Sequence, residues 1–346
     1  MKALLLAAGE GQRLRPLTDV LPKALIPVLN IPLIEFGLAA LVDAGADEVI
    51  VNAHSLATKL SRFAKDYKGA ARVESVVEKQ LLGTGGALRN VASQLAQERF
   101  LIANADVLHA VDLGKVLKAH LAGPVPVATL ALRSQGWESH GGFWCDESAA
   151  IRGYLAPGEK PPPGGRPGLF TGLHVLEPAI LAELPPEKTF CIVQNVYRPL
   201  LERAAPLRGL FVDEAPWEDM GTPARYLNST LNLLASLSSE GALPARARAL
   251  LGGRGYVERS GGIWAPPAWT GSPQVEGPSL LGEGAALKRA GKAGPLAVMG
   301  EGSVASQGAH LERCILWERA RAPKGQWKEC IFFQNGQSLP VTQPDA

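Results

Sequence analysis

Hydrophobic and polar residues alternate between two patterns along the first third of the chain. Short strand-like segments, several of them continuous apolar runs, lie at residues 2–7, 48–52, 72–77 and 100–104. Segments with apolar residues at helical spacing lie between them, at residues 33–44, 56–66 and 86–95. This alternation predicts an α/β domain with a Rossmann-like, mostly parallel sheet and helices on both of its faces.

The middle of the chain is less regular. Strands are predicted near residues 125–132 and 169–176, with a loop rich in proline and glycine at 157–168. A last helix is predicted at 222–237, with Thr222 as its N-cap and Pro223 at its first position. We therefore expect the first domain to span residues 1–237 and a linker to span 238–259.

Apolar residues recur at every sixth position in the sequence beyond the linker, a pattern that we call the register of six. Steps of six from Val275 reach only apolar residues, and small residues stand four places after most of them. The first set is Val275, Leu281, Leu287, Ala293, Met299, Ala305, Leu311 and Trp317, and the second is Ser279, Ala285, Gly291, Ala297, Ser303, Ala309 and Ile315. One apolar and one small residue in each hexad predict a short parallel β-helix over residues 260–346.

About 25 residues separate the first strand from the first helix, and a loop of that length in a compact domain indicates function. This loop contains AAGEGQRLRPLTDVLPKALIPV, with Gly9 and Gly11 directly after the strand and Arg13, Arg15 and Lys23 beyond them. Backbone N–H groups at the carboxyl edge of a parallel sheet bind anions, and the added cations suit several phosphates. A dinucleotide fingerprint is excluded because its third glycine is missing, and no Walker A sequence occurs.

The composition excludes several kinds of partner. Hydrophobic residues make up 46% of the 346 residues, and 35 basic and 33 acidic residues give a net charge of +2. The mixed order of the charges indicates no nucleic acid or membrane partner, although small anions remain possible. The first apolar run is too short for a signal peptide, and the four cysteines form no CxxC pattern, so we expect a cytoplasmic protein without disulfides or a zinc site.

The sequence LAAGEGQRLRPLT followed by PKALIPV resembles the signature of the sugar-1-phosphate nucleotidyltransferases, also called NDP-sugar pyrophosphorylases. Further pieces match in the family's order: LLGTGGAL, ANAD, FTGLHVLEP and WEDMGTPARY. The resemblance covers residues 1–237, and several members of the family carry a hexapeptide-repeat tail that folds as a left-handed parallel β-helix.

The resemblance implies a reaction and a set of site residues. A sugar-1-phosphate attacks the α-phosphorus of a nucleoside triphosphate, which gives an NDP-sugar and pyrophosphate. Arg13 would hold the β and γ phosphates and Lys23 the α phosphate, and Asp106 and Asp219 would share Mg²⁺. The nucleotide would also contact Ala8, Gly9, Gly11, Gly83 and Thr84.

The base and the sugar remain open. GTP and UTP are both candidates, as in mannose-1-phosphate guanylyltransferases and N-acetylmuramate-1-phosphate uridylyltransferases. An alternative is a regulatory subunit that binds nucleotide sugars without turnover, and a β-helix acyltransferase is disfavoured because the tail offers only His310. We expect the tail to hold a homo-oligomer together without taking part in the chemistry.

Overall fold

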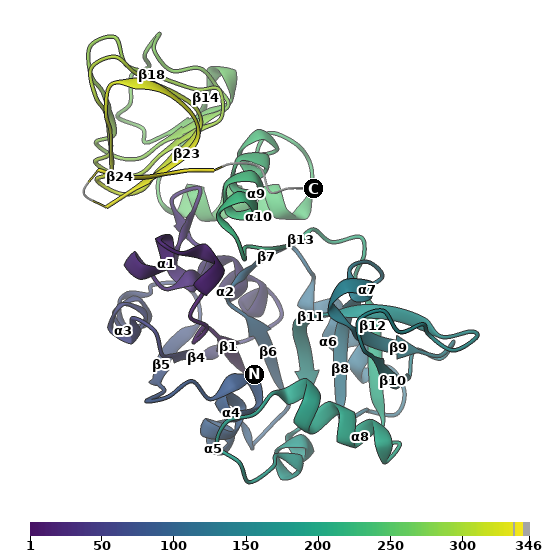
Figure 1. Ribbon diagram of the computed structural model, residues 1–346. Coiled ribbons are helices and arrows are strands. Elements are labelled where there is room, and N and C mark those ends of the chain that lie inside the picture. Colours follow the sequence, from purple (N-terminus) through teal and green to yellow (C-terminus); the bar gives the residue numbers. More distant parts are fainter. Residues whose placement is uncertain (335, 342–346) are drawn as a thin grey trace. The chain divides into compact units, whose positions relative to one another are not determined.

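The computed structural model describes residues 1–334 and 336–341 (Figure 1). The chain forms two compact units, one from Met1–Glu10 and Gly37–Trp217 and the other from Gly11–Phe36 and Glu218–Ala346. We call them unit 1 and unit 2. Residues 335 and 342–346 of the predicted tail lie outside the described residues, and the boundary at residue 237 stays a prediction.

Unit 1 is built on one mixed sheet. Its strands run in the order β10-β9-β11-β6-β1-β4-β5, and β8 pairs with both β11 and β12. The neighbours β5, β4, β1 and β6 are parallel, whereas β11 is antiparallel to β6 and β8. The bounds are β1 (Lys2–Leu6), β4 (Glu48–Ala53), β5 (Arg72–Val77), β6 (Phe100–Asn104), β8 (Ala128–Arg133), β9 (Gly142–Cys145), β10 (Ile151–Leu155), β11 (Arg166–Leu176) and β12 (Leu207–Phe211). The expected α/β class with a sheet rich in parallel strands is confirmed.

The three helices predicted between the first strands are present, and two of them differ in detail from the prediction. The predicted helix at 86–95 is two helices, α4 and α5, with a break at Val91. Helix α3 begins at Ala57 after Leu56 in a left-handed conformation, without a side-chain cap. The remaining elements are α2 (Ile34–Asp43), α3 (Ala57–Asp66), α4 (Gly83–Asn90), α5 (Ala92–Leu95), β7 (Val107–His109), α6 (Leu113–Leu121), α7 (Trp137–His140), η3 (Pro178–Glu183), the π-helix η4 (Val193–Tyr197), α8 (Arg198–Glu202) and β13 (Trp217–Asp219).

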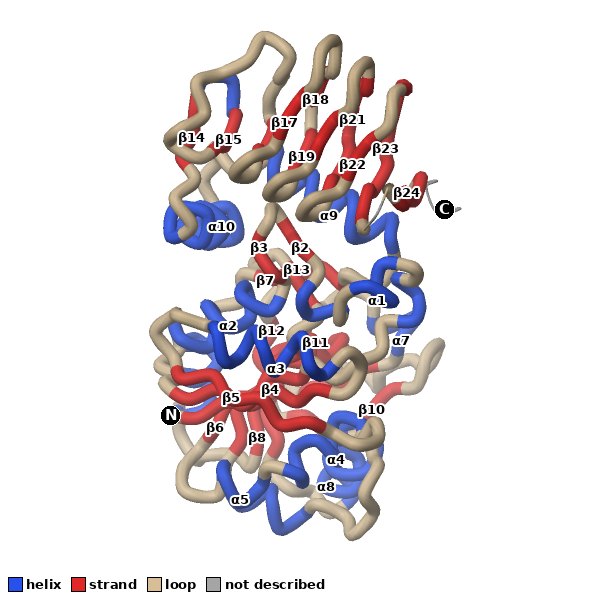
Figure 2. Tube along the Cα trace, turned by 90° about the vertical axis from the view of Figure 1, so that its left-hand side faces the viewer, coloured by secondary structure: helices blue, strands red, loops and turns tan. Residues whose placement is uncertain are grey.

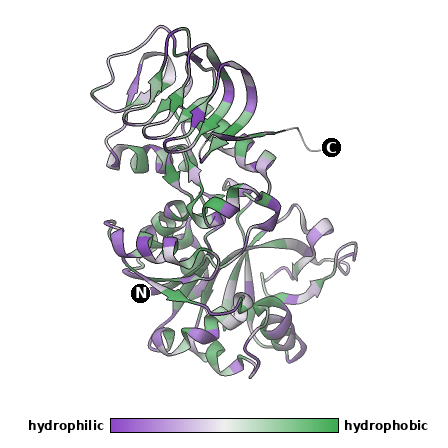
Figure 3. Ribbon diagram, turned by 60° about the vertical axis from the view of Figure 1, so that its left-hand side comes forward, coloured by the Kyte–Doolittle hydropathy of each residue, from purple (hydrophilic) through white to green (hydrophobic). Residues whose placement is uncertain are grey.

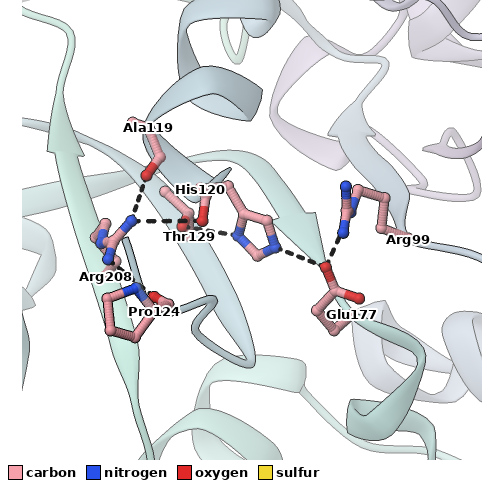
Figure 4. Close-up of polar contacts among 7 residues, drawn as sticks. All are labelled: Arg99, Ala119, His120, Pro124, Thr129, Glu177 and Arg208. Carbon is pink, nitrogen blue, oxygen red and sulfur yellow. Dashed lines mark hydrogen bonds and ion pairs between the residues drawn. The ribbon is translucent and has the colours of Figure 1, made fainter. Parts of the chain in front are cut away.

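The core of unit 1 lies on the sheet, where Leu4, Phe100, Leu130 and Phe143 are fully buried. Figure 3 shows hydrophobic residues along these strands. The edge where β6, β8 and β12 begin carries a polar network instead, drawn in Figure 4.

In this network the buried His120 lies between two partners, with Nδ1 2.9 Å from Oγ1 of Thr129 and Nε2 3.1 Å from Oε1 of Glu177. Arg99 donates to the same Glu177 oxygen at 2.9 Å, and Arg208 donates to carbonyl oxygens at the end of α6 and beyond it. Burial lowers the pKa of His120, with Glu177 opposing that effect. The network ties four strands and a helix together at the edge opposite the strand end that leads into Ala8.

The long loop of unit 2 is not irregular throughout. It holds the short elements η1 (Gln12–Leu14), α1 (Leu17–Val20), η2 (Lys23–Leu25), β2 (Pro27–Val28) and β3 (Ile31–Pro32), of which the last two form a hairpin. Helix α9 (Pro223–Ala235) begins as predicted, because Oγ1 of Thr222 accepts from the Arg225 backbone N–H at 3.3 Å. A second helix, α10 (Ala242–Gly253), occupies much of the expected linker and buries Leu243, Ala247 and Leu251.

Short strands follow α10, and most of them pair in parallel (Figure 2). In three of the strand pairs the paired residues lie 18 positions apart, as in Ser279↔Ala297 and Lys292↔His310, which equals three steps of six. The strands are β14 (Val257–Arg259), β15 (Ile263–Ala265), β16 (Ser279–Leu281), β17 (Ala286–Leu287), β18 (Lys292–Ala293), β19 (Ala297–Met299), β20 (Val304–Ala305), β21 (Ala309–Leu316), β22 (Arg321–Ala322), β23 (Gly325–Phe333) and β24 (Gln337–Pro340), with the 3-10 turn η5 (Ser260–Gly262) before β15.

The register of six corresponds to burial. All fifteen positions are buried except Leu287 and Ala285, which are half-buried. At the two ends of this array, β14 and β24 pair antiparallel with β15 and β23. Among the residues that the structure describes, no helix is both long and apolar enough to cross a membrane.

Candidate functional site

Three cations surround one carboxylate in unit 2. Lys23 Nζ lies 3.3 Å from Oδ1 of Asp219. Arg13 Nη2 and Arg225 Nη1 lie 3.5 and 3.1 Å from Oδ2 of the same residue. The structure thus brings together three residues that the sequence proposed, Arg13, Lys23 and Asp219, and adds Arg225. We call these four residues the Asp219 cluster, and it has an excess of positive charge.

The members of the cluster differ in burial. The Lys23 side chain is only 8% exposed, whereas those of Arg13 and Arg225 are 67% and 51% exposed. A buried ammonium needs a charged or polar partner, and Asp219 is one. Lys23 is therefore held in place by the fold, while the two guanidinium groups face water, where an anion can reach them.

Two glycines are required by this arrangement. Gly11 adopts a left-handed conformation with φ +62, and a Cβ there would lie 2.8 Å from Cγ2 of Thr18. A Cβ at Gly221 would lie 2.7 Å from both Nη2 of Arg13 and Oδ2 of Asp219. Glycine in the sequence WEDMGTP thus leaves the space in which Arg13 reaches the carboxylate.

In unit 1 the first strand leads into Ala8 and Gly9. The backbone N–H of Ala7 donates to Oδ1 of the buried Asn52 at 2.7 Å, and Nδ2 of Asn52 donates to Oε1 of the buried Glu78 at 2.8 Å. A Cβ at Gly9 would have no atom of the protein within 4 Å, and Gly9 is exposed. The end of β1 is therefore fixed, while the space beside Gly9 is open to a ligand.

Glu78 extends this chain of contacts to the glycine-rich segment. Its Oε2 accepts from the backbone N–H of Leu82 at 3.1 Å, one residue before α4 begins at Gly83. The side chain of Thr84 accepts from the Ile192 N–H at 3.0 Å. A Cβ at Gly83 would lie 2.7 Å from the Phe190 carbonyl oxygen, so packing explains that glycine without a ligand.

Asp106 lies in the turn between β6 and β7 in unit 1 and is half-buried. Among the described residues, no group of three or more His, Cys, Asp and Glu side chains could hold a metal by itself. Carboxylates such as Asp106 and Asp219 are nevertheless the ligand type that Mg²⁺ prefers, and Mg²⁺ completes its coordination with water and phosphate oxygens. The donor chemistry of these two residues fits the expected ion.

Sequence reasoning missed Arg225, Asn52 and Glu78. Arg225 stands three residues after the N-cap Thr222, so the helix start predicted at Thr222 places it in the first turn, next to the sequence WEDMGTP. Asn52 and Glu78 are buried polar residues at the ends of β4 and β5, and such residues need partners. That signal was available for Asn52, which closes an otherwise apolar run.

The comparisons with known proteins agree with this geometry. Residues 2–236 match the nucleotidyl transferase family. The chain therefore belongs to the nucleotidyl transferase family. A solved structure, HddC from Yersinia pseudotuberculosis complexed with GMP-PN, superposes with a TM-score of 0.55 at 20% identity, covering 67% of this chain and 98% of that chain. This likeness shows the shared fold.

Named relatives define the class within the family. A mannose-1-phosphate guanylyltransferase of Mycobacterium tuberculosis is 25% identical, covering 93% of this chain and 81% of the relative. A UTP–glucose-1-phosphate uridylyltransferase of Synechocystis is also 25% identical, covering 94% and 85%. A mannose-1-phosphate guanyltransferase of Schizosaccharomyces pombe is 31% identical over 68% of this chain and 65% of its own length. The expected class, a sugar-1-phosphate nucleotidyltransferase, is confirmed.

Proposed function

We propose that this enzyme transfers a guanylyl group from GTP to mannose-1-phosphate, giving GDP-mannose and pyrophosphate. The observation that carries the nucleotidyl transfer is the Asp219 cluster, three cations on one carboxylate inside the region that matches the family, whereas the choice of GTP and mannose-1-phosphate rests on the relatives. The relatives in Mycobacterium tuberculosis and Schizosaccharomyces pombe carry the name of that reaction. Uridylyl transfer to glucose-1-phosphate is the second candidate, because the Synechocystis relative is equally similar.

The Asp219 cluster suits the phosphates of the nucleotide. Triphosphate and sugar phosphate repel each other, so the enzyme must bring two anions together and offset their charge. Following the resemblance to the family, we assign Lys23 to the α phosphate and Arg13 to the β and γ phosphates; the buried ammonium of Lys23 and the exposed guanidinium of Arg13 are compatible with these roles. Arg225 is a third phosphate-binding group in this proposal, since it contacts the same carboxylate oxygen as Arg13.

The nucleophile needs no general base from the protein. The second pKa of a phosphate monoester is about 6, so a sugar-1-phosphate is mostly dianionic at neutral pH. Lys23 stabilises the negative charge that develops on the α-phosphate oxygens during in-line attack. The backbone of Ala8, Gly9 and Gly11 approaches the phosphates in this proposal, while Gly83 and Thr84 contact the base and ribose.

Asp106 and Asp219 would hold the magnesium ion. When bound, Mg²⁺ neutralises charge on the phosphate oxygens. Because Arg13, Lys23 and Arg225 surround Asp219, a bare divalent cation is repelled there, and we expect the metal to bind together with the phosphates. Asp219 then exchanges its partners, as the arginines turn from the carboxylate to the phosphates.

The tail and the location of the protein are parts of the same proposal. The offset of 18 residues in three strand pairs, three steps of six, supports a left-handed parallel β-helix, and we propose that this tail joins copies of the chain. Light scattering of the whole chain tests the assembly. We also propose that the protein is located in the cytoplasm, where reducing conditions suit its four free thiols.

Pyrophosphate release across a matrix of four nucleoside triphosphates and several sugar-1-phosphates tests the reaction. We expect the highest kcat/KM with GTP and mannose-1-phosphate, and much slower release from Lys23→Ala prepared in parallel. Highest activity with UTP and glucose-1-phosphate would favour the second candidate. Tight binding of nucleotide sugar without pyrophosphate release for any pair would instead identify a regulatory subunit.

A further inference from the structure

We propose that the C-terminal segment of unit 2 positions the loop that carries Arg13 and Lys23, so that residues beyond 225 set the catalytic rate without touching substrate. The inference rests on the phosphate-binding roles proposed for Arg13 and Lys23. It replaces the division of labour expected from the sequence, in which the tail only assembles the oligomer. The link runs through the β2–β3 hairpin and four hydrogen bonds.

The hairpin is directly continuous with the catalytic lysine. Lys23 opens η2, whose last residue is followed by Ile26 and then by β2. The Ile26 N–H donates to the Lys23 carbonyl oxygen at 3.2 Å, and the Leu33 N–H donates to the Ile26 carbonyl oxygen at 3.0 Å. A shift of the hairpin is therefore transmitted to the backbone of Lys23 through short, bonded steps.

The tip of the hairpin is bonded to distant parts of the chain. Leu29 and Asn30 have φ values of 52 and 60, the left-handed pair that a two-residue hairpin turn requires. Nδ2 of Asn30 donates to the Met299 carbonyl oxygen at 3.0 Å and to Oη of Tyr256 at 3.3 Å. The backbone of Asn30 thus adopts the conformation that the turn requires, and its side chain binds the last residue of strand β19.

A second anchor lies at the start of β2. Oη of Tyr226 donates to the Pro27 carbonyl oxygen at 2.6 Å and accepts from Nε1 of Trp317 at 2.9 Å. Tyr226 is fully buried and Trp317 is 4% exposed. Burial raises the pKa of Tyr226 well above its usual value, so the phenol keeps the proton that it donates to Pro27 at every working pH.

The second anchor and the Asp219 cluster share one helix. Tyr226 directly follows Arg225, and both lie in the first turn of α9. The neighbouring turn is bonded to the tail by a different contact, because Nη2 of Arg313 donates to Oδ1 of Asn228 at 2.9 Å. Arg313 therefore links the tail to α9 without touching the hairpin, and it provides a matched control.

Variants at Asn30 separate the link from the turn. Asn30→Gly keeps the left-handed turn and removes only the side-chain bonds, while Asn30→Asp has the same shape and presents a carboxylate to the Met299 carbonyl oxygen. We expect both, and Tyr226→Phe, to lower kcat by about ten- to a hundredfold, since a misplacement near 1 Å has effects of that size. Hydrogen exchange should become faster in residues 11–36.

Arg313→Ala should lower the unfolding midpoint as much as Asn30→Gly but keep kcat within about threefold. The inference is overturned if Asn30→Gly has the kcat of the parent enzyme, or if Arg313→Ala loses as much kcat as the hairpin variants at equal stability. If Tyr226→Phe fails to fold, the Asn30 pair decides alone. Lys23→Ala separates the two proposals. Full activity of Lys23→Ala contradicts the proposed function. An inactive Lys23→Ala together with fully active Asn30 and Tyr226 variants contradicts only this inference.

Discussion

Lys23 and Asp219 lie 196 residues apart in the chain, and their side chains form an ion pair of 3.3 Å. The pair joins the glycine-rich loop after the first strand to the sequence WEDMGTP near the end of the region that matches the family. Two other cations, Arg13 and Arg225, share the same carboxylate. Charge at this site is therefore the property that mutation should test.

Lys23→Ala should lower kcat more than it raises KM for the nucleoside triphosphate. The ammonium contributes most when negative charge develops at the five-coordinate α-phosphorus, and Asp219 keeps Arg13 and Arg225 as partners, so the fold should persist. Steady-state kinetics and an unfolding curve check both parts. Arg62→Ala, at a side chain that is 85% exposed on α3, is the control. An unchanged kcat with a raised KM would show that Lys23 serves ground-state binding alone.

Asp219→Asn should abolish turnover and lower the unfolding midpoint, because three cations then surround a neutral amide. Adding inorganic pyrophosphate should raise the unfolding midpoint of this variant more than that of the parent, since the anion supplies the missing negative charge. Asp213→Asn is a matched control, because Asp213 forms an ion pair of 3.2 Å with Arg166 elsewhere. Equal responses of the Asp219 and Asp213 variants to pyrophosphate would argue against the proposed charge role.

Asp106→Asn should also abolish turnover while leaving the midpoint within the range of surface variants, because Asp106 is half-buried at a strand end. Activity should be measured over a range of Mg²⁺ concentrations. Near-normal rates at saturating Mg²⁺ would remove Asp106 from the proposed metal site.

Arg225→Ala should raise KM for the nucleoside triphosphate by roughly tenfold, the effect of one hydrogen bond to a charged group. Arg225→Lys should recover part of the loss, because the charge returns without the planar fork of donors. Titration with pyrophosphate in the absence of sugar phosphate measures the same effect on binding alone. If Arg225→Ala binds pyrophosphate as tightly as the parent does, Arg225 contacts Asp219 but does not bind phosphate.

Local patterns predicted six strands of unit 1 and the helices α2 and α3, because these segments show apolar runs or apolar residues at helical spacing. Other elements of unit 1 were not predicted, among them β7, β9, β10, β12, α6, α7 and α8. The patterns misplaced α4, which begins at Gly83 rather than at residue 86. Glycine has low helix propensity, so the sequence GTGG suggests a loop. The segment is helical all the same, and its glycines are needed for packing: a Cβ at Gly85 would lie 2.3 Å from the Phe190 ring.

The sequence motifs predicted which residues belong to the site, but not how those residues contact one another. Resemblance supplied Arg13, Lys23 and Asp219, and the structure gives their shared contact. The attachment of the loop to the tail has no local signal, because the hydrogen bond between Asn30 and Met299 joins positions 269 residues apart. Contacts of that kind depend on the complete fold.

A buried histidine in unit 1 links stability to pH. The side chains of His174 and Tyr197 form a short hydrogen bond between Nδ1 and Oη, and both residues are buried among aromatic rings, with the His174 and Phe170 centroids 5.1 Å apart. Burial lowers the pKa of His174 to about 3 and raises that of Tyr197 well above its usual value. Both groups are therefore neutral at pH 7 and remain joined by this hydrogen bond.

Acid should destabilise the protein between pH 6.5 and 3 through His174, because the unfolded chain binds a proton there and the folded chain does not. The loss should be about 2 kcal/mol at pH 5, from the two pKa values. In His174→Gln, which cannot titrate, the free energy of unfolding should fall less between pH 7.5 and pH 5, although it starts lower at pH 7.5. Urea unfolding at the two pH values measures this difference, with His140→Gln, at an exposed histidine, as the control. If His174→Gln and the parent lose equal stability on acidification, His174 accepts a proton in the folded state and the proposed link between its burial and acid sensitivity fails.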